Sequence, residues 1–153
     1  MKVTVTKLKV SLPTAIHYLR DIDKDRSILN CQKLTSVKLE YVTEMSDSYG
    51  YISNPLLIEI LTPLLASIRG HNSIYSNNSL TTINQPLLTN IGGDNSIDSN
   101  NSLITIDQSL LANVGGNNYI YSNNSLTTID QSLLVSIGET NNISNNNSLI
   151  TIN

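Results

Sequence analysis

Hydrophobic and polar positions recur along this chain with a fixed period of 23 residues. The octamer SNNSLTTI at 76–83 returns as SNNSLITI at 99–106, SNNSLTTI at 122–129 and NNNSLITI at 145–152. When Leu80 is taken as position 1 of the repeat, positions 1, 4, 9, 12 and 18 are apolar in every copy from Leu34 onward. A constant period of this length indicates a solenoid, in which each coil buries its apolar strip against the next coil.

Local propensity predicts two short strands in each coil. The segment after position 1, such as residues 80–83, is rich in β-branched residues, and the segment around position 18 alternates in polarity. Glycine pairs at 92–93 and 115–116 mark the corner before the second strand, and Pro63 and Pro86 follow the first strand. Equivalent strands of successive coils would run parallel, about 4.8 Å apart. The predicted fold class is therefore all-β.

The repeats also define the organisation of the chain. Five complete coils occupy residues 34–148, and residues 149–153 begin a sixth. Upstream of Leu34, the sequences KLKVSLP and ILNCQKL look like the two halves of one further, irregular coil. We therefore divide the chain into an N-terminal strand with a degenerate capping coil, residues 1–33, and a regular solenoid, residues 34–153.

Position 21 carries the same polar residue in every regular coil. These residues are Asn54, Asn77, Asn100, Asn123 and Asn146, and Cys31 takes the place in the degenerate coil. An amide at a turn can accept a hydrogen bond from one backbone N–H and donate to a carbonyl of the neighbouring coil. We therefore expect a structural ladder of inward asparagines that pairs backbone groups at a buried bend.

Two stretches carry a resemblance to known families. The run IGGDNSIDSNNSLITI, residues 91–106, resembles the repeats of receptor L domains. The run ILNCQKLTSVKL, residues 28–39, is similar to the BspA-like leucine-rich repeats of bacterial and protist surface proteins, which also allow asparagine or cysteine at the turn. The resemblance covers nearly all of the chain from Lys7 onward. It implies a right-handed, leucine-rich-repeat-like solenoid that recognises proteins or cell surfaces.

The chain departs from those families at positions 6 and 16, where they usually have apolar residues. Position 6 carries Leu39, Thr62, Gln85, Gln108 and Gln131, and position 16 carries Tyr49, Asn72, Asn95, Asn118 and Asn141. A stack of long amides in a narrow core is costly unless every amide is hydrogen-bonded. We therefore expect the glutamines to face solvent, whereas the asparagines fit either an inward or an outward orientation.

Charge is distributed unevenly and limits the partners. The chain has 153 residues and a net charge of −3, and all nine Lys and Arg lie at or before Arg69. Nucleic-acid binding needs clustered cations, so we expect no nucleic-acid partner. We also expect no membrane insertion, because no apolar run approaches the roughly 20 residues of a spanning helix. The start of the chain lacks the apolar stretch of a signal peptide, which suggests a cytoplasmic protein, or a fragment of a cell-surface protein.

The two ends of the chain suggest self-association. Leu149 and Ile152 begin a new coil just before the last residue, and residues 2–10 form an alternating, cationic strand. An uncovered strand edge invites pairing with another chain. A head-to-tail homo-oligomer, and a purely structural role, are therefore alternatives to ligand recognition.

Catalytic or metal-binding chemistry has little support in the sequence. His17 and His71 fall at different repeat positions, and Cys31 is the only cysteine. Asp107 and Asp130 share position 5 and would stack, but a calcium site needs more converging carboxylates. We expect no enzyme activity, no cofactor and no metal site. Most of the Asn-x-Ser sequons, which are potential glycosylation sites, coincide with the ladder asparagines. The repeat therefore explains these sequons better than glycosylation does.

The best candidate for a binding surface lies on the strand around position 18. Positions 17 and 19 flank an inward isoleucine and should face solvent together, which groups Tyr75, Asp98, Tyr119 and Tyr121. Tyrosines beside an acidic residue are typical of binding surfaces, although tyrosine also simply suits exposed strands. A column of threonines at position 3, which includes Thr105, offers a flat array that can order water. An ice-binding face is therefore a further alternative.

Overall fold

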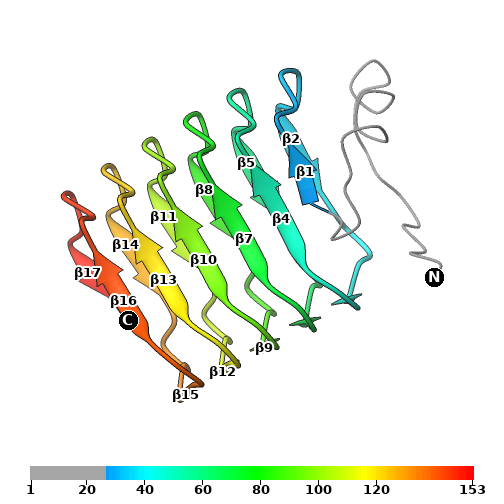
Figure 1. Ribbon diagram of the computed structural model, residues 1–153, viewed down its shortest axis with the longest axis vertical. Helices are drawn as coiled ribbons and strands as arrows, with labels where there is room; N and C mark the ends of the chain where they lie inside the picture. The colour runs from blue at the N-terminus through cyan, green and yellow to red at the C-terminus, as the bar shows by residue number, and fades with distance from the viewer. Residues whose placement is uncertain (1–26) are drawn as a thin grey trace.

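The computed structural model describes residues 27–153, which form a solenoid with three short strands in each coil (Figure 1). Each strand pairs with its counterparts one coil away, so three parallel sheets run along the molecule. Sheet A contains β1 (Ser27–Leu29), β4 (Tyr49–Ile52), β7 (Asn72–Tyr75), β10 (Asn95–Asp98), β13 (Asn118–Tyr121) and β16 (Asn141–Ser144). Sheet B contains β2 (Ser36–Lys38), β5 (Glu59–Leu61), β8 (Thr82–Asn84), β11 (Thr105–Asp107), β14 (Thr128–Asp130) and β17 (Thr151–Ile152). Sheet C contains β3 (Glu44–Met45), β6 (Ser67–Ile68), β9 (Asn90–Ile91), β12 (Asn113–Val114) and β15 (Ser136–Ile137).

The strand pairing confirms the 23-residue coil and the all-β class. Ile97 of β10 pairs in parallel with Ile120 of β13, and Ile106 of β11 pairs with Ile129 of β14, each one period apart. No helix occurs among residues 27–153. Residues 27–33 continue the solenoid in the N-terminal direction, because β1 pairs with β4. The expected N-terminal strand lies outside the described residues.

The third strand of each coil corrects the expectation of two. Sheet C is built from two-residue strands such as Asn90–Ile91, which pair with β6 and β12 on either side. Two residues are too few to show an alternating pattern, so periodicity gives no signal for them. These strands exist because stacking brings equivalent backbone segments together.

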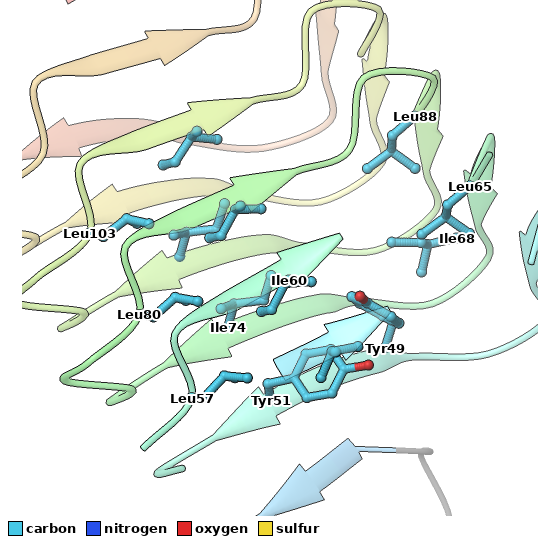
Figure 2. Close-up of a cluster of buried hydrophobic side chains, with 14 of the residues drawn as sticks. Tyr49, Tyr51, Leu57, Ile60, Leu65, Ile68, Ile74, Leu80, Leu88 and Leu103 are labelled. Atoms are coloured by element: carbon cyan, nitrogen blue, oxygen red, sulfur yellow. The ribbon is translucent and has the colours of Figure 1, made fainter. Parts of the chain in front are cut away.

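The core is the stack of inward apolar columns that the repeat predicts. In Figure 2, Leu57, Leu80 and Leu103 follow one another along one side of the core, and Leu65 and Leu88 follow one another along the other side. All five of these leucines are fully buried. Because each coil covers the apolar strip of its neighbour, the core is continuous through the middle coils.

The corners have local causes. Position 20 has a positive φ in every coil, for example 58° at Ser76 and 54° at Ser99, which turns the chain out of sheet A. The glycines lie at the predicted corner before sheet A, but none has a positive φ. They are needed for close stacking, because a Cβ on Gly115 would lie 2.2 Å from the carbonyl oxygen of Gly92. Pro63 directly follows Thr62 at the end of the sheet B segment, as expected.

Candidate functional site

The position-21 asparagines form the predicted ladder. The backbone N–H of Asn77 donates to Oδ1 of Asn100 at 3.0 Å, and Nδ2 of Asn100 donates to the carbonyl of Ile74 at 2.8 Å. The same two bonds repeat along the ladder, and the backbone N–H of Cys31 donates to Oδ1 of Asn54 at 2.9 Å. The ladder residues Asn54, Asn77, Asn100 and Asn123 are fully buried, with Cys31 and Asn146 nearly so. This part of the predicted site is therefore structural and internal.

The glutamines of position 6 face inward, so the expectation that they face solvent is wrong. Gln85 and Gln108 are fully buried, and Nε2 of Gln108 donates to Oε1 of Gln85 at 2.8 Å. Gln131 donates to Gln108 in the same way, also at 2.8 Å. The stack succeeds because the spacing of the coils brings each amide within hydrogen-bond reach of the next.

The asparagines of position 16 face inward as well and join the glutamines. Nδ2 of Asn95 donates to Oδ1 of Asn118 at 2.9 Å and to Oε1 of Gln108 at 3.0 Å. The asparagine column donates toward later coils, whereas the glutamine column donates toward earlier coils. The two columns are thus antiparallel ladders, cross-linked into one buried network.

The four predicted binding residues lie together on the outer surface of sheet A. Asp98 of β10 pairs with Tyr75 of β7 on one side and with Tyr121 of β13 on the other. Tyr119 lies beside this column, opposite Ser96. All four side chains are partly exposed, while the isoleucines between them are buried. We call these four residues the tyrosine face.

The tyrosine face is ordered by contacts between its own members. The rings of Tyr119 and Tyr121 meet edge to face, with centroids 6.4 Å apart and planes at 82°. The Tyr121 hydroxyl donates to the Asp98 carboxylate, and the nearby carboxylate raises the pKa of Tyr121. Partial burial raises the pKa of Asp98, which outweighs the lowering by its hydrogen bonds from Ser99 and Tyr121. The hydrogen bonds of Asp98 therefore do not fully offset the cost of partly burying its carboxylate.

A second polar column lies at position 15, at the corner before sheet A. The backbone N–H of Asp94 donates to Nδ1 of His71 at 2.9 Å, and the backbone N–H of Asn117 donates to Oδ1 of Asp94 at 2.7 Å. The bond from Asn117 is the main cause of the lowered pKa of Asp94. Ser48, His71 and Asp94 stand in successive coils, and the backbone N–H of His71 donates to Oγ of Ser48 at 3.2 Å. The column thus satisfies backbone groups at a corner.

The remaining candidates stay separate from the tyrosine face. Asp107 and Asp130 are in register on sheet B, and each accepts a bond from the backbone N–H two residues later at 3.2 Å. No group of three or more His, Cys, Asp or Glu that could hold a metal ion occurs among the described residues. The described part also contains no helix long and apolar enough to cross a membrane. His17 and the cationic residues 2–10 lie outside the described residues.

Two exposed features were not expected from the sequence. Asn78, Asn101 and Asn124 at position 22 form a further amide ladder at the surface, with Nδ2 of Asn101 donating to Oδ1 of Asn78 at 3.1 Å. Leucines at position 8 form an exposed apolar row along one corner. Both columns are visible in the repeat alignment, but the sequence pattern alone does not show which polar or apolar column faces outward.

Comparison of the chain with protein-family models, curated proteins and solved structures finds no match. The structure shows a parallel β-solenoid of about five turns. The resemblance to leucine-rich repeats therefore depends on the residues at 28–39 and 91–106.

Proposed function

We propose that this chain is a non-catalytic binding module, a leucine-rich-repeat-like solenoid that recognises a protein or cell-surface ligand through the tyrosine face. The observation that carries the proposal is the column Tyr75, Asp98 and Tyr121, with Tyr119 beside it, on one exposed sheet. The Tyr119 and Tyr121 rings are held by edge-to-face packing, and Tyr121 is also held by a hydrogen bond to Asp98, so these two side chains lose little freedom on binding. The resemblance to receptor L-domain and BspA-like repeats supports the same class.

The chemistry of the face favours a cationic partner. Asp98 is partly buried between two tyrosines, and no Lys or Arg follows Arg69 in the sequence. A Lys or Arg side chain from a partner would pair with the carboxylate and lie against the electron-rich faces of the rings. We therefore expect the ligand to be a protein segment that presents Lys or Arg.

A displayed library of random peptides, panned against the immobilised chain, tests this function. The wild type should enrich peptides with basic residues, and the variant carrying Tyr75→Ser, Tyr119→Ser and Tyr121→Ser should lose them. Asp98→Asn should keep some binding but lose the preference for basic residues. Each variant should retain its circular dichroism spectrum, because the changed side chains lie outside the core.

The matched control changes the same number of hydroxyl-bearing residues on another sheet. Thr82→Ser, Thr105→Ser and Thr128→Ser are in register on sheet B, away from the tyrosine face, and should leave peptide enrichment unchanged. Equal enrichment by wild type and tyrosine variant would move the binding site elsewhere and remove the basis of the proposal.

The same threonine column supports ice binding as a second candidate function. Thr82, Thr105 and Thr128 lie side by side on adjacent parallel strands and are partly exposed. Thermal hysteresis of the wild type, abolished by Thr105→Lys, is the expected sign of this activity. Absence of hysteresis in the wild type would eliminate it.

A further inference from the structure

One exposed row of the solenoid is apolar in every described coil that contains it. Position 8 carries Tyr41, Leu64, Leu87, Leu110 and Leu133, whose side chains are 56%, 41%, 41%, 37% and 51% exposed. Position 10, beside it, carries small or apolar residues such as Ala66, Ala112 and Val135, and Val135 is 84% exposed. We call the outward residues at positions 8 to 11 of the five coils the leucine face; the position-9 residues between them pack in the core. It borders sheet C and is separate from the tyrosine face.

The leucine face carries little charge, with Glu44 as the one charged residue at positions 8 to 11. From Pro63 onward, positions 7 to 11 contain no charged residue in any coil. The rest of that half of the chain carries carboxylates and no cation after Arg69. Two copies of the chain would repel one another through their acidic surfaces, but they can meet at the leucine face without bringing carboxylates together.

The spacing of the row selects its partner. Its side chains repeat at the separation of adjacent strands, about 4.8 Å. An α-helix lying along the row repeats every turn at about 5.4 Å, so it moves out of step by about half a side-chain spacing over four intervals. An extended strand along the row presents same-face side chains about 6.6 Å apart, which fits less well. A second copy of this solenoid has the same side-chain spacing, because its own row has the same strand separation.

We propose that the leucine face is a contact surface for a second copy of this chain, with the two solenoids side by side and antiparallel. A two-fold axis at Leu87 then places Leu64 of one copy against Leu110 of the other, and Tyr41 against Leu133. The antiparallel direction keeps Glu40 and Glu44, which flank Tyr41, at opposite ends of the pair. A parallel pair would instead place these carboxylates near their own counterparts.

The size of the face sets the strength of the contact. Four residues by five coils cover roughly 13 Å by 24 Å, at about 3.3 Å per residue and 4.8 Å per coil. Two such faces bury less than the roughly 1,200 Å² at which standard stable interfaces begin. The dimer is therefore weak and reversible, so its test must capture transient contacts.

Oxidative cross-linking captures such transient contacts. Single cysteines introduced into the full chain provide the cross-linking sites. Cys31 is 2% exposed, so the wild type should give little background. Leu87→Cys lies on the proposed two-fold axis and should form disulfide-linked dimers. Ile104→Cys is the matched control, since Ile104 is 47% exposed and lies beside sheet B. We expect several-fold more dimer for Leu87→Cys than for Ile104→Cys at equal protein concentration.

The direction of the pair is tested at the end of the row. Leu133→Cys should form few dimers alone, but it should cross-link to a Tyr41→Cys chain mixed with it. Efficient dimers of Leu133→Cys alone would overturn the antiparallel arrangement. Equal dimer yields for Leu87→Cys and Ile104→Cys would overturn the proposal itself, whether or not the tyrosine face binds peptides. Circular dichroism of each variant checks that the solenoid is intact.

Discussion

The earliest described coils and the later coils fill the same two inward positions with different chemistry. Near the start of the described solenoid, position 16 is Tyr49 and position 6 is Leu39, and the Tyr49 ring packs edge to face on Tyr51 with centroids 5.1 Å apart. In the later coils, residues such as Asn95 and Gln108 occupy these positions and bond to one another. The backbone is the same in both regions. This solenoid therefore accepts either rings or amides inside, provided that the amides are stacked.

The boundary between the two regions shows that a buried amide depends on a stacked neighbour for its hydrogen bonds. Thr62 and Tyr49 stand where the amide columns would continue beyond Gln85 and Asn72. At this boundary Oδ1 of Asn72, Nε2 of Gln85 and Oγ1 of Thr62 are buried and have no hydrogen-bond partner within the described residues. An amide ladder always leaves one donor and one acceptor at its ends. Its benefit per residue therefore grows with the number of coils.

Interrupting the position-21 ladder inside the amide-filled region should lower stability more than any other change considered below. Asn100→Ala leaves the N–H of Asn77 without its acceptor and removes one donor from the carbonyl of Ile74. The orphaned N–H and the lost bond to the carbonyl should together lower the free energy of unfolding by about 2 to 4 kcal/mol, measured by urea denaturation. Asn101→Ala, in the exposed ladder one residue later, is the control and should cost much less. Equal losses at both sites would show that burial does not set the cost.

Removing one glutamine tests the buried network in the same coils. Gln108→Ala deprives Nε2 of Gln131 of its 2.8 Å acceptor, and Nδ2 of Asn95 keeps only its bond to Oδ1 of Asn118. We expect a loss of about 1 to 3 kcal/mol by urea denaturation. Thr105→Ala, at a partly exposed position in the same coil, should change stability far less. A negligible loss for Gln108→Ala would mean that water enters and replaces the amide.

These glutamines show where sequence reasoning succeeded and failed. The period specified the coil, the apolar columns and the asparagine ladder, because each follows from repetition and elementary hydrogen bonding. The glutamines were misassigned because a single long amide in an apolar core is costly, whereas a stack satisfies itself. The sequence did contain a signal for the inward stack. Within the segment from Tyr49 to Gln85, positions 6 and 16 both change to amide residues.

The outward orientation of the tyrosine face follows from alternation alone. Once position 18 is inward, positions 17 and 19 must be outward, which puts Tyr119 and Tyr121 on one surface. Contacts within the face, such as the bond from Tyr121 to Asp98, depend on rotamers and neighbouring coils, which the sequence does not specify. The ligand depends on a partner that the sequence does not contain.

A smaller effect is expected from extending the amide region across its boundary. Thr62→Gln would place a carbonyl oxygen where Nε2 of Gln85 has no partner. One further buried hydrogen bond should raise the free energy of unfolding by about 0.5 to 1.5 kcal/mol. Thr105→Gln, at a partly exposed position on sheet B, should leave stability unchanged. Destabilisation by Thr62→Gln alone would show that the apolar packing around Tyr49 has no room for a third glutamine.

The two regions also differ at the surface, as one carboxylate in each shows. The effect of these carboxylates on stability should be the smallest. Glu59 lies 3.1 Å from Nζ of Lys38, and hydrogen bonds from Lys38 and Ser36 lower its pKa. Asp98 lies in the region without cations, and burial raises its pKa. A lowered pKa stabilises the fold above the unfolded-state pKa, and this contribution is lost as the pH falls through the folded-state value. A raised pKa has the opposite sign, so ionised Asp98 opposes folding at neutral pH.

Two isosteric variants therefore should shift stability in opposite directions. At pH 7, Glu59→Gln should unfold at a lower urea concentration than the wild type, and Asp98→Asn at a higher one. The Glu59 difference should be within about 0.2 to 1 kcal/mol, because the ion pair is partly exposed. Both differences should shrink as the pH falls, since the wild-type carboxyls then become neutral like the amides that replace them. Urea denaturation at a series of pH values measures this, and a shift of the same sign in both variants would contradict the electrostatic contrast between the regions.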